Sequence, residues 1–177
     1  MDNTVQGKKS GFAPIREDAS RIIVSYDMKP VGETADATWR EIYLYKKQTP
    51  QVTSDIVKQA ILADINERVT SRIVSTLTWN QKPVWLSVEN QQDWKAGYDH
   101  ALQTEGTDLP LKYKLGEDSE GQPVYHTFTS LNSFADFWDT CRRHIHQCLQ
   151  EGWAEKDSID WSLYAIGGQA ADEKPEE

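Results

Sequence analysis

The chain has 177 residues, of which 27% are charged and 38% hydrophobic, so we expect a folded globule close to the size of one ordinary domain. Its 19 basic and 28 acidic residues give a formal net charge of −9 with no basic stripe, which argues against nucleic acid as a partner because phosphate contacts need a basic face. No apolar run approaches the roughly 20 residues that span a bilayer, and no charged start precedes an apolar segment, so we expect no membrane partner and no secretory signal.

Both ends of the chain have the composition of flexible segments. Residues 1–20 are polar and contain two glycines and Pro14 without a sustained hydrophobic period, which predicts a flexible N-terminal arm. The alternative is an arm that docks on a neighbouring subunit, with Phe12 and Ile15 as its anchors. Residues 167–177 are predicted to form an acidic tail.

Residues 21–50 form a β-rich segment. Hydrophobic and polar residues alternate along 21–28 and along 39–46, a pattern that predicts two strands. The link over 29–38 contains Pro30 and Gly32, which favour a turn, but it is too long for a minimal hairpin. The segment is either a small subdomain or an edge of the main sheet.

Residues 51–166 are predicted to form the main α+β domain, which begins with a helix capped by Thr53 or Ser54. Apolar residues recur at every fourth position of this helix, at Val57, Ile61, Ile65, Val69 and Ile73. Each four-residue step turns about 40° around a helix of 3.6 residues per turn, so the stripe winds. The helix therefore contacts more than one partner or breaks near residues 70–71.

The stretch over 77–102 contains three of the seven tryptophans. It predicts a strand, a tight turn at 80–83 and a second strand over 84–86. Two registers remain open. A four-residue loop places Trp79 and Trp85 on opposite faces of the hairpin, whereas a three-residue loop places them on the same face.

A helix is predicted to follow this hairpin. Ser87 is a suitable N-cap for it, and Gly106 closes it. Trp94, Tyr98 and Ala101 then share one face, which is typical of a helix that packs on a core.

A second β-hairpin is predicted from strands at 111–115 and 124–128, joined by an acidic turn over 116–123. The turn lacks the ordered ligand spacing of a calcium loop, so we interpret it as a solvated tip.

The second long helix is predicted to begin at Ser130 or Ser133 and to end at Gly152 as its C-cap. Its apolar stripe is the clearest periodic signal in the chain and contains Leu131, Phe134, Phe137, Trp138, Cys141, Ile145, Cys148 and Leu149. The whole pattern predicts an α+β fold in which antiparallel β-hairpins pack with two long helices and a short C-terminal element over 157–164, with flexible termini.

The sharpest candidate for a metal site is the set of Cys141, His144 and Cys148, which lie at i, i+3 and i+7 of the predicted helix. Both cysteines fall inside the apolar stripe, where buried reduced thiols are the expected state. The chain also lacks the usual zinc-binding spacings. We therefore predict no metal and no cofactor.

No catalytic signature is present in the sequence. There is no nucleophile elbow of the G-x-S-x-G type and no glycine-rich phosphate loop. The carboxylate pair Asp136 and Asp139 is assigned to a solvated helix face. We predict that the protein is not an enzyme, and a small hydrolase or metal-dependent enzyme remains a rival hypothesis.

The tryptophans and tyrosines, seven of each, exceed what one small core needs, so some are candidates for exposed binding anchors. The candidate binding residues are Trp79, Trp85, Trp94, Tyr98 and Trp153. A ligand- or glycan-binding module is the alternative function, and it would need two or more exposed tryptophan rings along one groove.

Three runs of the sequence resemble a small family of bacteriophage and prophage proteins, of tail-associated or tail-fibre-assembly type, that carry a domain of unknown function. The runs are TWNQKPVWLSVENQQDWKAGYDHA, LPLKYKLGEDSEGQPVYHTF and SFADFWDTCRRHIHQCLQEGWAEKDSID. The resemblance covers roughly residues 52–164 and implies no catalytic residues. In those relatives a longer helical region usually precedes the domain, whereas a β-rich segment precedes it here.

The resemblance implies a non-enzymatic structural or assembly protein of the virion, and specifically of its tail. Its expected partners are other phage structural proteins, with self-association into a homo-oligomer as a further expectation. The expected locations are the virion and, during assembly, the host cytoplasm.

Overall fold

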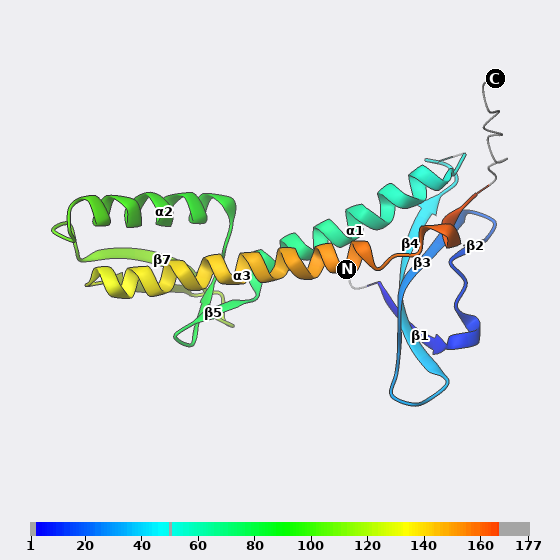
Figure 1. The fold of residues 1–177 in the computed structure, drawn as a ribbon, viewed down its shortest axis with the longest axis horizontal. Coiled ribbons are helices and arrows are strands. Elements are labelled where there is room, and N and C mark those ends of the chain that lie inside the picture. The colour runs from blue at the N-terminus through cyan, green and yellow to red at the C-terminus, as the bar shows by residue number, and fades with distance from the viewer. Residues whose placement is uncertain (1–2, 50, 167–177) are drawn as a thin grey trace, which may run out of the picture. The chain divides into compact units, whose positions relative to one another are not determined.

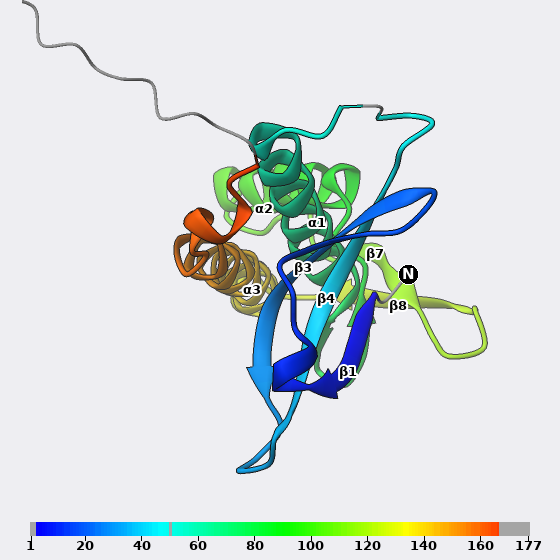
Figure 2. The same cartoon turned by 90° about the vertical axis from the view of Figure 1, so that its right-hand side faces the viewer.

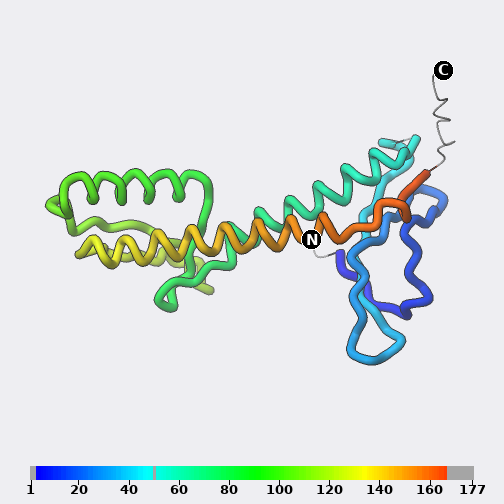
Figure 3. Tube along the Cα trace, viewed as in Figure 1, coloured from blue at the N-terminus to red at the C-terminus, as the bar shows by residue number. Residues whose placement is uncertain are grey.

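The structure is a computed structural model that describes residues 3–49 and 51–166. It has the predicted α+β fold, in which three helices accompany antiparallel sheets (Figures 1 and 3). The chain divides into two compact units. The first unit takes the described residues of Met1–Ile65 and Ala154–Glu177, and the second unit is Asn66–Trp153.

This division differs from the predicted boundary near residue 50. Helix α1 (Ser54–Ser75) and helix α3 (Leu131–Asp157) each contribute residues to both units, so the first unit takes the beginning of α1 together with the end of the chain. Helix α1 runs without interruption through residues 70–71. The predicted alternative that the helix breaks there is therefore wrong.

The first unit contains a four-stranded antiparallel sheet with the order β1-β4-β3-β2. Its strands are β1 (Thr4–Lys8), β2 (Ile15–Glu17), β3 (Arg21–Pro30) and β4 (Asp36–Tyr45). In Figure 2, β1 lies beside β4, and β4 beside β3. The two strands predicted in residues 21–50 are confirmed, and their link is shorter than expected because both strands extend into it.

The prediction of a flexible arm over residues 1–20 is wrong for the described part of that segment. Strand β1 pairs with β4, with Val5 opposite Trp39, and the Phe12 ring packs edge-on against Trp39 at 5.9 Å. Strand β1 was not predicted, in part because Gly7 within it suggested flexibility. A Cβ at this position would lie 2.7 Å from Cη2 of Trp39, so the glycine permits close packing rather than flexibility.

Side chains from α1 and from the end of the chain complete the first unit. Val57, Ile61 and Ile65 of α1 are fully buried. Asp64 of the same helix accepts hydrogen bonds from Tyr26 and Arg40 of the sheet. The short 3-10 helix η2 (Trp161–Tyr164) is the predicted C-terminal element, and its Tyr164 hydroxyl donates to the Ser25 carbonyl oxygen at 2.9 Å.

The second unit contains two hairpins, and the Trp85 backbone N–H, just after the first, donates a hydrogen bond to the Leu115 carbonyl oxygen in the second. Strands β5 (Leu77–Trp79) and β6 (Lys82–Val84) form the first hairpin, and β7 (Leu111–Glu117) and β8 (Pro123–Phe128) form the second. The first turn has two residues, Asn80 and Gln81, both with positive φ. Because Trp79 pairs with Lys82, Trp79 and Trp85 point to opposite faces of the hairpin.

Aromatic rings form the core of the second unit. Phe128 and Phe134 stack at 4.2 Å with an interplanar angle of 7°, while Trp79 and Trp94 each meet Phe137 edge-on at 5.1 Å. Burying one such side chain contributes about 1.5–3 kcal/mol. Helix α2 (Val88–Gln103) supplies Trp94 and begins as predicted, since the Ser87 hydroxyl accepts a hydrogen bond from the Asn90 backbone N–H.

Helix α3 does not end at Gly152, so the predicted C-cap is wrong. The helix continues to Asp157, and Gly152 is buried within it. The residue is glycine for packing reasons, because a Cβ there would lie 2.4 Å from Cγ2 of Val69 on α1.

Candidate binding site

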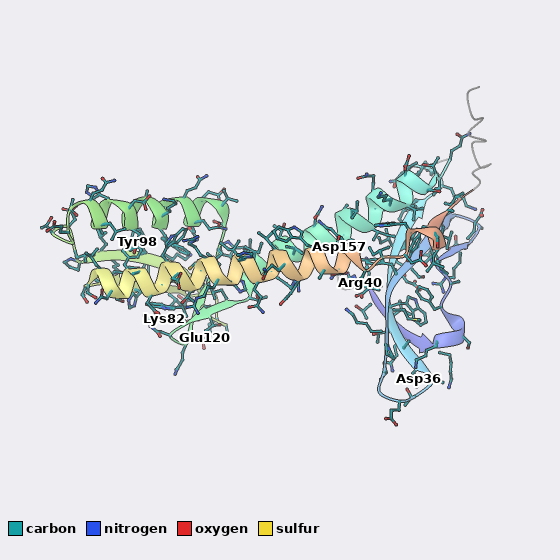
Figure 4. The ribbon with its side chains drawn as sticks, in the orientation of Figure 1. Asp36, Arg40, Lys82, Tyr98, Glu120 and Asp157 are labelled. Atoms are coloured by element: carbon teal, nitrogen blue, oxygen red, sulfur yellow. The ribbon has the colours of Figure 1, made fainter. Side chains whose placement is uncertain are left out.

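The five aromatic residues predicted as binding anchors fall into three groups. Trp79 and Trp94 are buried in the core, so their prediction as exposed anchors is wrong. Tyr98 is half-buried and lies on the side of α2 that packs on Phe134, 5.4 Å away (Figure 4). Trp85 and Trp153 are exposed, each at 52%. Among the five candidate residues, these two have exposed indole surface available to a partner.

Trp85 borders two adjoining depressions of the second unit. The first, of about 360 Å³, lies along α1 and is lined by Glu67, Thr70, Ser71, Val74 and Ser75. The second, of about 610 Å³, is lined by Ser75, Pro83, Val84, Ser87, Asn90, Lys114, Gly116 and Glu117. We call the two together the Trp85 site. Trp153 lines neither of them, so one exposed tryptophan, rather than two, meets a groove.

The backbone around Trp85 is held by three elements. Its N–H donates to the Leu115 carbonyl oxygen of β7 at 2.7 Å, and its own carbonyl oxygen accepts from the Asn90 side chain of α2 at 2.8 Å. The next N–H, of Leu86, donates to the Val74 carbonyl oxygen of α1 at 2.9 Å. An exposed indole on a backbone fixed in this way is preorganised for contact with a ligand.

The β6–β7 wall of the site depends on a glycine. A Cβ at Gly116 would lie 2.8 Å from the Pro83 carbonyl oxygen, so only glycine allows the two strands to approach so closely. The charged side chains that line the site are only partly paired with each other. Lys114 and Glu117 form an ion pair at 2.6 Å at one end, and Glu67 lies in the other depression.

The set of Cys141, His144 and Cys148 does not have the chemistry of a metal site or a nucleophile. His144 Nε2 lies 3.2 Å from the Arg72 carbonyl oxygen and 3.7 Å from Cys148 Sγ. A carbonyl can only accept, so Nε2 carries the proton and has no lone pair for a thiol proton or a metal. Burial raises the pKa of the Cys141 thiol to about 12 and also raises that of Cys148.

Across residues 3–49 and 51–166, no group of three or more histidine, cysteine, aspartate or glutamate side chains is arranged to hold a metal ion. Asp136, assigned to a solvated helix face, is indeed exposed, but it also accepts a hydrogen bond from Trp79 Nε1 at 2.8 Å. That contact ties the helix face to the core. The sequence gives no sign of this contact, because Trp79 and Asp136 are 57 positions apart.

The first unit contains a buried carboxylate that was not singled out in the sequence. Glu41 is 5% exposed and accepts hydrogen bonds from Trp39 Nε1 at 2.9 Å and from the Tyr43 hydroxyl at 3.0 Å, and it pairs with Arg16. Burial raises the pKa of Glu41, but the hydrogen bonds and the Arg16 charge outweigh it, so the pKa lies below its usual 4.5. A fully partnered carboxylate of this kind is structural.

Comparisons with protein-family models, with curated proteins and with solved structures find no match. None of the helices in the described part of the chain has the length and the apolar character that a membrane crossing needs.

Proposed function

We propose that this protein is a non-enzymatic structural or assembly component of a bacteriophage particle, associated with its tail, and that it works through protein–protein contacts. The observation that carries the proposal is the exposed indole of Trp153 on α3. The apolar residues Phe134, Phe137 and Cys141 of the same helix are fully buried, whereas Trp153 is 52% exposed. Tryptophan is among the residues most enriched at the energetic centres of protein interfaces.

The size of the contact supports a role for Trp153 in docking. An aromatic side chain can bury roughly 150–250 Å², and apolar burial is worth about 25 cal/mol per Å². Covering the exposed half of one indole would thus add about 2–3 kcal/mol to an interface. The bacteriophage part of the proposal is supported by the three runs of sequence that resemble tail-associated proteins.

Cross-linking in a phage-producing culture tests the proposal. A photoreactive amino acid replaces Trp153, and particles and their precursors are separated on a density gradient and analysed by mass spectrometry. We expect the chain in the particle or precursor fractions, with cross-links from position 153 to other structural proteins. The matched control is Gln147, an exposed residue of α3 that lies about 120° around the helix from Trp153.

Two results would contradict the proposal. One is the absence of the chain from both particles and precursors. The other is equal cross-linking from positions 147 and 153, which would show that Trp153 is not at a specific contact. Size-exclusion chromatography with light scattering then separates self-association, which would give a defined oligomer, from contacts with other subunits alone.

A further inference from the structure

The Trp85 site has an unusual combination of side chains for a groove between elements of a small fold. Its apolar lining consists of the exposed Trp85 indole, the partly exposed Val74 and Pro83, and Val84, which is only 2% exposed. Five of the twelve residues that line the site beside Trp85 carry short neutral groups that can hydrogen-bond, namely the hydroxyls of Thr70, Ser71, Ser75 and Ser87 and the amide of Asn90. The site is therefore an aromatic surface bordered by several uncharged donors and acceptors, with the charged Glu67, Lys114 and Glu117 also in its lining.

We propose that the Trp85 site binds a sugar ring of a neutral saccharide. A pyranose has an apolar C–H face and a rim of hydroxyl groups, so it matches an indole bordered by hydroxyl and amide side chains. The Lys114–Glu117 pair adds charged partners for further hydroxyls at one end of the site. This role is separate from the contacts proposed for Trp153, which lines neither depression.

Other ligand classes fit these side chains less well. A nucleotide or another phosphate ligand needs unpaired cations, whereas among the described residues that line the site the single cation, Lys114, is already paired with Glu117. A peptide that docks through an apolar anchor needs an enclosed apolar pocket, and here the aliphatic lining is limited to Val74, Pro83 and the buried Val84.

The site offers one exposed tryptophan ring, not the two or more along one groove that a dedicated glycan-binding module would need, so it binds a single sugar ring weakly. A ligand of about a dozen heavy atoms held by one such ring binds with a Kd on the order of 1 mM. A site of this strength works when several copies act together, since linked sites raise the overall affinity by about 10²–10⁴.

Fluorine NMR of the full chain labelled with 5-fluorotryptophan tests the proposal directly. The seven tryptophans give separate signals, and that of Trp85 is assigned from the variant Trp85→Phe. The probes are maltotriose, cellotriose, chitotriose, mannotriose and galactotriose, each titrated to about 20 mM, well above the Kd on the order of 1 mM expected for one ring. We expect at least one of them to shift the Trp85 signal saturably and to leave those of the buried Trp79 and Trp94 unchanged.

Trp153 supplies the matched control because it is exposed to the same extent as Trp85. Trp85→Ala should weaken saccharide binding at least about tenfold, and Trp153→Ala should leave it unchanged. Binding by Trp85→Ala is read from the ligand signals by saturation transfer, and circular dichroism confirms that both variants are folded. The proposal is overturned if no probe shifts Trp85, if Trp85 and Trp153 shift alike, or if a mixture of peptides shifts Trp85 when the saccharides do not.

Discussion

Gly152 of α3 faces Val69 of α1 so closely that a Cβ on the glycine would lie 2.4 Å from Val69 Cγ2. Val69 is β-branched and has one strongly preferred rotamer in a helix, so it cannot turn away without strain. Gly152→Ala should therefore destabilise the protein, although alanine is the better helix former by about 1 kcal/mol. Overpacking costs about 1–3 kcal/mol, so we expect a net loss of up to about 2 kcal/mol in urea unfolding.

The control for this prediction is Gly11→Ala, because nothing lies within 4 Å of a Cβ at Gly11. It should change the free energy of unfolding by less than about 0.5 kcal/mol. Val69→Ala combined with Gly152→Ala should recover part of the loss, since the two residues share one contact. Equal stability of Gly152→Ala and the natural protein would show that the helices move apart without cost.

The hydrogen bond from Trp79 to Asp136 gives a second prediction. Asp136→Ala removes the acceptor of the Trp79 indole N–H, which lies at the edge of the core. Asp136 is exposed, so water can replace it in part, and we expect a loss of only about 0.5–1.5 kcal/mol in the free energy of unfolding. Asp136→Asn keeps an acceptor oxygen and should cost less than alanine. A larger loss for asparagine than for alanine would contradict this account.

The hairpins and helices were predictable where the hydrophobic period was strong. Strands β3, β4, β7 and β8 and the N-cap Ser87 follow directly from alternation and capping chemistry. The hairpin that carries Trp79 and Trp85 has a two-residue turn, so both predicted loop lengths, of three and of four residues, are wrong. The two indoles nevertheless lie on opposite faces, as the four-residue loop predicted. The hairpin register decides which tryptophan is available to a ligand, and the hydrophobic period of the sequence does not determine that register.

Two of the errors have a common cause in glycine. Gly7 was interpreted as a sign of flexibility and Gly152 as a helix end, yet each lies where a neighbouring side chain comes within 3 Å of the missing Cβ. A sequence shows that a residue has no side chain, but the reason depends on the partner, here Trp39 or Val69. The Trp85 site was equally hidden, because its walls come from three parts of the chain that meet only in the fold.

The buried carboxylate of Glu41 predicts how stability depends on pH. Its pKa is lowered in the folded state, so the unfolded state binds the proton more readily. The stability that Glu41 contributes is therefore complete above its usual pKa of 4.5 and is lost as the pH falls through the folded value. Glu41→Gln removes this titration. The fall in thermal midpoint on acidification below about pH 4.5 should be smaller in that variant than in the natural protein.

Glu120→Gln is the control for the pH experiment, since Glu120 is exposed at the turn between β7 and β8 (Figure 4). It should leave the acid limb of the stability curve unchanged. Asp18, whose side chain accepts hydrogen bonds from Arg21 and Ser20, also has a lowered pKa, so some acid sensitivity remains in Glu41→Gln. Identical acid limbs in the natural protein and Glu41→Gln would refute the assignment.

The two cysteines should be unreactive in the folded protein. Burial raises the pKa of Cys141 to about 12, so at pH 8 only about one thiol in 10⁴ is ionised, and Cys148 is shifted in the same direction. We expect a disulfide reagent such as DTNB to label neither thiol faster than the chain unfolds, and to label both at once in denaturant. Cys148→Ala isolates Cys141, which should remain equally slow. Rapid native labelling of the natural protein that disappears in Cys148→Ala would show that Cys148 is a reactive thiol, in conflict with the proton placed on His144 Nε2.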